Sequence, residues 1–220
     1  MKKRKYSALL PDQDYSVNVF TDTEENSLIN EDDTPITLVD NIVGTAEIVC
    51  SVRPIDLQFV AACMPNSHYD RKRFAAITLR VCSPMCTALL FTSGKLVLTG
   101  TTTRSECLMA ALELVRLLRQ YMRGLDFFVN GVSIQNVVAH VELDIPTGGK
   151  LDIARMYSQH CEFCTYQSSM FPGLSYRPDN SPVVLLCFFS GRIVITGGRC
   201  ERDIKEGWRK LWPVIRQYIQ

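Results

Sequence analysis

The sequence has no apolar run of roughly 18 residues, which is the length that a membrane-spanning helix needs. It also has no apolar segment of the kind found in secretory signal peptides. Hydrophobic residues make up 46% of its 220 residues and charged residues 21%, both ordinary values for a globular protein. We therefore expect one or two domains with a hydrophobic core and no membrane partner.

Catalytic and cofactor motifs are also missing. No nucleophile and base form a recognisable set, and Gly197-Gly198 lacks the spacing of a nucleotide-binding loop. The pattern His160-Cys161-x-x-Cys164 contains residue types that bind metals, but one C-x-x-C without a second pair is a weak signal, and ordinary thiols are the expectation. We expect no enzymatic activity, no cofactor and no metal.

Cysteine is abundant, yet its arrangement does not favour disulfides. Nine is an odd number, the spacings are irregular, and several cysteines fall inside apolar strand or helix patterns. Such usage is typical of reduced thiols, so we expect an intracellular protein.

Charge is distributed unevenly along the chain, although the net charge is only +1. Residues 1–52 hold four of the 24 basic side chains and ten of the 23 acidic ones, which leaves 20 basic and 13 acidic in residues 53–220. Residues 1–35 lack periodicity, and we expect a disordered acidic arm there. Its basic start, Lys2-Lys3-Arg4-Lys5, is consistent with a nuclear-import signal or with a solubilising terminus. The basic remainder permits a polyanionic partner.

The chain contains one stretch twice. Phe74 to Met122 aligns with Phe171 to Ile219 without a gap, at a constant offset of 97 residues. Further upstream the copies continue with small gaps, and Asn41-Ile42-Val43 matches Asn136-Val137-Val138. A duplication of this size predicts a pseudo-twofold molecule of two repeats, residues 36–127 and 128–220.

Each repeat has the same expected order of strand, helix, antiparallel strands and long helix. The predicted elements of the first repeat are a strand from Asp40, a helix over Ile55–Met64, a strand over Arg73–Cys82, a hairpin of Thr87–Thr92 and Leu96–Thr101, and a helix over Ser105–Arg123. The last helix of the second repeat, about Arg202–Ile219, contains Pro213 and should kink there. This order predicts an α+β fold with helices on one face of a sheet and the other face uncovered.

Three details of the helices are also predicted. Asp56 and Asp152 recur at helix starts and should act as caps. Trp208 and Trp212 are one turn apart and should belong to the core. The apolar stripe of the first long helix should consist of Leu108, Leu112, Val115, Leu118 and Met122.

The uncovered face indicates what the protein binds. Its expected strand residues are apolar or neutral, and His140 has the same parity as they do. Such a face either packs on another sheet or dimer partner, or binds a flat ligand. Basic residues favour the second reading, because they fall at the edges and turns around the apolar stripe: Lys72, Arg73, Arg80, Lys95, Arg177 and Arg192. An apolar floor with a cationic rim suits a DNA minor groove.

Long strings in both repeats carry a resemblance to a known family. They are Lys72-Arg73-Phe74-Ala75-Ala76, Thr87-Ala88-Leu89-Leu90-Phe91-x-Ser93-Gly94-Lys95, Phe171-Pro172-Gly173-Leu174-x-Tyr176-Arg177 and Leu185-Leu186-x-Phe188-x-Ser190-Gly191-Arg192. Over nearly all of residues 36–219 the sequence resembles the conserved core of the TATA-box-binding protein family. The resemblance implies a saddle whose concave sheet sits in the minor groove of promoter DNA, and a role in transcription initiation in the nucleus.

The resemblance also implies roles for individual residues. Wedges between base pairs would be Phe74, Phe91, Phe171 and Phe188. The floor in the minor groove would be Asn41, Val43, Leu89, Val97, Thr99, Asn136, Val138, Leu186, Val194 and Thr196. Phosphate contacts would fall to Arg73, Arg80, Ser93, Lys95, Arg177, Ser190 and Arg192. Asparagine donors suit the acceptors of A·T pairs, and phosphate contacts position the protein without reading sequence.

Protein partners implied by the resemblance are transcription factors IIA and IIB, TATA-binding-protein-associated factors and the RNA polymerase machinery. Two departures weaken this expectation. Gln167 and Ser169 replace the acidic pair that contacts factor IIB in the family, and Met170 replaces a leucine. The first long helix, which is densely basic in the family, here includes Glu113. The alternative is therefore a related paralogue that acts as a protein-interaction scaffold or at promoters without a TATA box.

Overall fold

The computed structural model describes residues 34–220. The basic cluster Lys2–Lys5 and almost all of the expected acidic arm lie outside these residues. The strands are β1 (Leu38–Cys50), β2 (Ser67–His68), β3 (Ala76–Cys82), β4 (Met85–Phe91), β5 (Lys95–Thr101), β6 (Phe127–Glu142), β7 (Cys164–Thr165), β8 (Leu174–Tyr176), β9 (Val184–Cys187) and β10 (Arg192–Gly198). The helices are α1 (Leu57–Cys63), α2 (Arg104–Tyr121), α3 (Ile153–Gln159), α4 (Glu201–Ile215) and the 3-10 helix η1 (Arg216–Tyr218).

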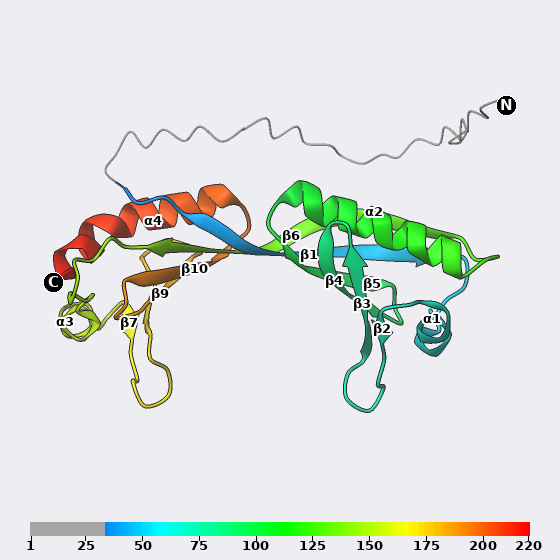
Figure 1. Ribbon diagram of the computed structural model, residues 1–220, viewed down its shortest axis with the longest axis horizontal. Coiled ribbons are helices and arrows are strands. Elements are labelled where there is room, and N and C mark those ends of the chain that lie inside the picture. The colour runs from blue at the N-terminus through cyan, green and yellow to red at the C-terminus, as the bar shows by residue number, and fades with distance from the viewer. Residues whose placement is uncertain (1–33) are drawn as a thin grey trace, which may run out of the picture.

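All ten strands form one antiparallel sheet in the order β2-β3-β4-β5-β1-β6-β10-β9-β8-β7. Counted from the two edges inward, β2 to β5 and then β1 correspond one by one to β7 to β10 and then β6. The pseudo-twofold axis of the duplication therefore runs between β1 and β6. These two central strands are the longest, at 13 and 16 residues, and they extend through both halves (Figure 1). The predicted α+β fold and its two repeats are confirmed.

Hairpins of matching geometry close the central part of each half. Gly94 follows β4 and Gly191 follows β9, both with φ of +89°, a backbone conformation that side chains disfavour. The N–H of Gly94 donates to the carbonyl of Phe91 at 2.9 Å, and the N–H of Gly191 donates to that of Phe188 at 3.0 Å. The turn therefore fixes an aromatic residue at the same place in both halves.

Helices α2 and α4 lie along one face of the sheet, each over its own half (Figure 1). Beneath them are two hydrophobic cores, one per repeat, built from the inward residues of the strands. Asp56 accepts hydrogen bonds from the N–H groups of Gln58 and Phe59, and Asp152 accepts one from Arg155, so both predicted caps are confirmed.

Helix α2 buries three residues of the predicted stripe, Val115, Leu118 and Met122, but not the other two. Its start is fixed by a capping box between Thr103 and Glu106. Leu108 is only half-buried and Leu112 is 43% exposed, whereas the buried face consists of Cys107, Ala110, Ala111, Leu114, Val115 and Leu118. The small residues bring the helix close to the sheet, where a Cβ on Gly44 would collide with the Cys107 sulfur. The predicted stripe was therefore wrong at Leu108 and Leu112, and it missed the small residues that face the sheet.

Helix α4 ends earlier than predicted. It stops at Ile215, two residues after Pro213, which has no backbone N–H to donate, and the chain continues as the 3-10 helix η1 to Tyr218. Trp208 is buried, as predicted, and its indole N–H donates to the carbonyl of Pro35 at 2.8 Å. The Trp212 ring lies 5.5 Å from it, centroid to centroid, and is half-buried.

All nine cysteines fall within residues 34–220 and are unpaired. No helix in this part of the chain has the length and apolar character of a membrane span.

Substitutions on helix α2 test its buried stripe. Leu114→Ala removes a fully buried side chain and should lower the free energy of unfolding by about 2–5 kcal/mol. Leu112→Ala, on the exposed side, should change it by no more than about 0.5 kcal/mol. Urea unfolding of both variants measures the difference, and equal losses would contradict the observed orientation of the helix.

Candidate nucleic-acid interface

The face of the sheet opposite α2 and α4 has no element covering it in the described part of the chain (Figure 1). The loop between β2 and β3 and the loop between β7 and β8 descend on either side of it. All ten residues expected to form the floor are half-buried and alternate with fully buried neighbours that point to the helices. The floor is thus one continuous surface across both repeats.

Two asparagines lie at the centre of this face. Val43 pairs with Asn136 and Asn41 pairs with Val138, so the two amides come from adjacent strands. The Oδ1 of Asn41 accepts from the N–H of Gly100 at 2.7 Å and from the Thr99 hydroxyl at 3.1 Å. Near the twofold axis, therefore, the amide oxygen of Asn41 is already engaged by the protein.

Asn136 repeats the arrangement in the second half. Its Oδ1 accepts from the N–H of Gly197 at 2.8 Å, and its side chain also exchanges hydrogen bonds with Thr196 at 3.0 and 3.3 Å. A backbone N–H can only donate, so it fixes the carbonyl end of each amide toward the protein. The NH₂ group of Asn41 and the second N–H of the Asn136 amide are consequently left as donors at the centre of the open face.

Two pairs of phenylalanines flank the floor. The rings of Phe74 and Phe91 are 6.1 Å apart and those of Phe171 and Phe188 are 5.7 Å apart, both edge to face. Phe74 is 48% exposed and Phe171 42%, while the two hairpin rings are half-buried beneath them. An exposed aromatic ring braced by a second ring can be inserted into a stack of bases without rearrangement.

Turns before the strands hold the exposed rings. The strand predicted to begin at Arg73 instead begins at Ala76, because the N–H groups of Arg73 and Phe74 both donate to the carbonyl of Asp70 at 3.0 Å and close a turn. In the second half the N–H of Phe171 donates to the carbonyl of Gln167 at the same distance. The loops that descend beside the face in Figure 1 thus present the two rings.

The seven residues expected to contact phosphate are all exposed. They differ in the contacts that they already make within the protein. Arg80 donates to the Thr87 hydroxyl at 2.9 Å, whereas Arg192 forms an ion pair with Glu142 at 2.8 Å. Sequence alone could not show this second contact, because it depends on the pairing of β10 with β6.

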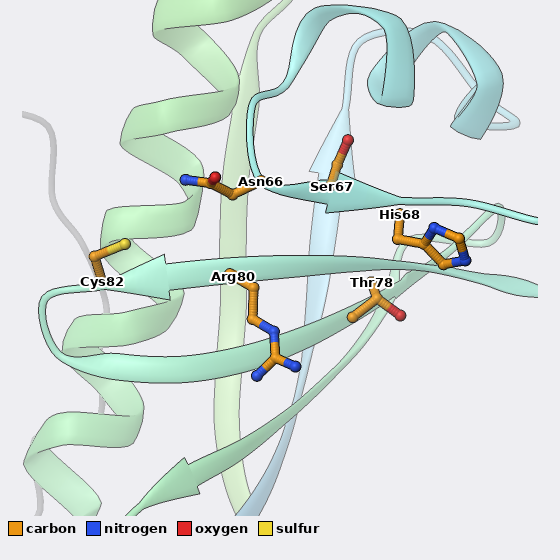
Figure 2. Close-up of a pocket in the computed structure, with 6 residues that line it drawn as sticks. All are labelled: Asn66, Ser67, His68, Thr78, Arg80 and Cys82. Carbon is orange, nitrogen blue, oxygen red and sulfur yellow. The ribbon is translucent and has the colours of Figure 1, made fainter.

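A hollow opens at the β2 edge of the sheet, beside Arg80 (Figure 2). It is lined by Asn66, Ser67, His68, Thr78, Arg80 and Cys82. Figure 2 shows His68 and Cys82 at opposite ends of it, so they do not form a nucleophile and base pair. The hollow places the cationic Arg80 beside the neutral hydroxyls of Ser67 and Thr78.

The His160-Cys161-x-x-Cys164 pattern has a structural explanation. His160 Nε2 lies 2.9 Å from the Tyr218 hydroxyl, which donates to Gln159 Oε1 at 2.6 Å. Burial raises the pKa of the Cys164 thiol to about 11, so it stays protonated at neutral pH. Within residues 34–220 no three potential ligands gather as a metal site would require.

Comparison with known proteins identifies the family. The family model described as "Transcription factor TFIID (or TATA-binding protein, TBP)" matches residues 37–121 and 131–218, one segment per repeat. TATA box-binding protein-like 2 of Takifugu rubripes is 35% identical over 181 residues, which are 81% of this chain and 52% of that protein. The TATA-box-binding protein of Drosophila melanogaster is 33% identical over 181 residues, 81% of this chain and 48% of that protein.

A solved structure agrees in fold. The Methanococcus jannaschii TBP matches with a TM-score of 0.69 and 31% sequence identity, covering 83% of this chain and 99% of that one. The chain spans about half the length of the first curated relatives that it matches. Matched segments cover well over half of the sequence and coincide with the two halves of the sheet. The chain therefore belongs to the TATA-binding protein family.

Proposed function

We propose that the chain is a transcription initiation factor that binds the minor groove of A·T-rich promoter DNA, such as a TATA box, with its open face. One observation carries the proposal: two asparagine NH₂ groups lie at the centre of an otherwise apolar face, held there by the N–H groups of Gly100 and Gly197. The family and the printed names of the relatives support it.

The chemistry of the face favours A·T pairs. In the minor groove these pairs present only acceptors, adenine N3 and thymine O2, which match the asparagine donors. Guanine adds an amino group, which would meet the valines of the floor, such as Val43 and Val138, without an acceptor. The floor therefore discriminates by donor count and fit, while the exposed rim residues bind phosphate.

We further propose that the phenylalanine pairs kink the DNA. The two pairs lie at either side of the floor, so each would enter the base stack at one end of the site. The approach of apolar wedges from the minor groove unstacks a step and bends the duplex toward the major groove. Flexible T-A steps lower the energy of this deformation, which adds to the preference for TATA-like sequences.

Removing a wedge should reduce binding and bending together. Phe91→Ala or Phe188→Ala loses an aromatic contact worth about 1.5–3 kcal/mol, so affinity should fall roughly ten- to a hundredfold. Binding and bending are measured by fluorescence anisotropy and energy transfer on one end-labelled TATA duplex. Phe128→Ala is the control, because this ring lies outside the floor, with the guanidinium carbon of Arg119 on α2 4.8 Å from its centroid. A Phe188→Ala variant that still bends the duplex fully would contradict the proposed insertion.

Rim and floor should separate in their effects. Lys95→Ala should weaken binding to TATA and scrambled duplexes alike and lower the slope of log affinity against log salt by about 0.9. Asn136→Ala should instead narrow the preference for TATA by about 1 kcal/mol, roughly fivefold, with the salt slope unchanged. Titrations of both duplexes across a salt series measure the two effects. If the two variants behaved alike, the assignment of rim and floor would be wrong.

A nuclear role with general factors as partners completes the proposal. We propose contacts with factors IIA and IIB, with associated factors and with the polymerase machinery. The convex surface of α2 exposes Met109 and Leu112 as well as Arg116, whose guanidinium is tied to Glu113 at 2.7 Å. This surface is less cationic than the family pattern implies, which supports the alternative of a paralogue with its own protein partners.

Partner choice at the second descending loop is testable. Gln167 and Ser169 are exposed on the loop and carry no charge for a cationic partner. A conventional factor IIB should therefore bind the complex with DNA more weakly than it binds a relative with acidic residues there. Gln167→Glu with Ser169→Glu should recover part of the difference, chiefly in association rate and at low salt. Ternary-complex formation on one TATA duplex measures it, and no change in the double variant would locate the determinant elsewhere.

A further inference from the structure

The two central strands each contain an extra residue directly before the groove asparagine. The register of β1 against β6 shifts between Val39 and Asn41, which leaves Asp40 as the additional residue. A second shift lies between Val43, which pairs with Asn136, and Gly44, which pairs with Ile134. Gln135 is therefore the additional residue on β6. A bulge of this kind interrupts the alternation of side chains and can direct a side chain toward a different face of the sheet. The duplication has therefore built two equivalent positions, occupied by a carboxylate in one strand and an amide in the other.

Both side chains reach across to the neighbouring strand on the open face. Gln135 Nε2 donates to the Thr45 hydroxyl at 2.8 Å. Asp40 Oδ1 lies 2.8 Å from His140 Nδ1, and the two side chains are 37% and 15% exposed. When Asn41 is superposed on Asn136, Asp40 falls on Gln135 and Thr45 on His140. The same cross-strand pair is thus neutral in one half and ionisable in the other.

The charged side chains around His140 include one more carboxylate than cations when the His140 ring is neutral. From β1 it faces Asp40, on its own strand β6 Glu142 follows two residues later, and β10 contributes Arg192. Arg192 contacts Glu142 at 2.8 Å and Asp40 at 3.9 Å, so one guanidinium serves two carboxylates. In the other half Glu47 is paired with Arg53 at 2.9 Å, and Lys95 lies opposite it on β5.

We propose that the Asp40–His140 pair is a proton-linked DNA-positioning element of the second half of the face, an inference that rests on the proposed minor-groove function. A carboxylate beside the floor is repelled by the negative potential of the minor groove unless a nearby cation neutralises it. Protonation of His140 at Nε2 supplies that charge, while Nδ1–H donates to the Asp40 carboxylate. Nε2–H then remains as the donor of the ring for the acceptors of an A·T pair. The DNA complex therefore takes up a proton at His140.

The sign of the pH effect follows from this linkage. DNA binds the protonated form more tightly, so affinity is greatest at low pH and falls as the ring deprotonates. One linked proton limits the slope to tenfold per pH unit, and we expect roughly three- to tenfold weaker binding at pH 8.5 than at pH 6.0.

The test is a titration of one fluorescent TATA duplex from pH 6.0 to 8.5 at constant ionic strength. Asp40→Gln with His140→Thr copies the neutral pair of the other half and should bind with no pH dependence. At pH 8.5 it should bind more tightly than the wild type, because the uncompensated carboxylate is gone. His140→Gln alone keeps an amide donor for Asp40 and should behave at every pH like the wild type at pH 8.5.

Matched controls address the equivalent pair of the other half and a histidine outside the open face, His68. Gln135→Ala with Thr45→Ala and, separately, His68→Asn should both keep the wild-type pH slope. A wild type that prefers TATA DNA but has the same flat profile as His140→Gln would overturn this inference and leave the proposed function intact. Failure of the wild type to prefer TATA DNA at any pH would overturn both. A pH slope that survives in both Asp40→Gln/His140→Thr and His140→Gln would also overturn it, since the proton would then bind elsewhere.

Discussion

The antiparallel pairing of β1 with β6 is the constraint on which the rest of the molecule depends. It joins the two repeats edge to edge, so a chain that could have made two separate small domains makes one sheet of ten strands. Because side chains alternate along a strand, the pairing places the floor residues on the open face and the core residues under the helices, with bulges at Asp40 and Gln135 adjusting the register. The same pairing brings Asn41 and Asn136 to the centre of that face.

An open apolar face has consequences for stability as well as for binding. The valines and leucines of the floor are only half-buried, so part of the stabilisation available from about 25 cal/mol per Å² of apolar burial is not used in folding. The fully buried residues on the other side, such as Leu98 and Ile195, supply the core that each half needs. Because the helix-covered face supplies the hydrophobic core, the residues of the floor can vary according to what the open face binds without a loss of core packing.

Much of this could be predicted from the sequence because it depends on local periodicity. The alternation in β4 and β5, the turn at Gly94 and the second copy of each follow from residues that are close in the chain. The buried side of α2 was predicted only in part, because the close approach of Cys107 to Gly44 depends on how the helix packs on the sheet. The bulges, and the ion pair of Arg192 with Glu142, require knowledge of which strands pair, and no short-range pattern carries it.

The two halves of the face have diverged in charge while keeping their geometry. Hairpin turns, asparagine anchors and ring pairs are nearly superposable, as the equal φ angles of Gly94 and Gly191 illustrate. Their ion pairs are not: Glu47 is held by Arg53 in the first half, whereas Arg192 is shared by two carboxylates in the second. A twofold-symmetric face would bind a nearly palindromic site equally well in either direction. If the face binds DNA as proposed, the divergence provides a means to tell one end of the site from the other, because electrostatic differences set register and orientation more than overall affinity.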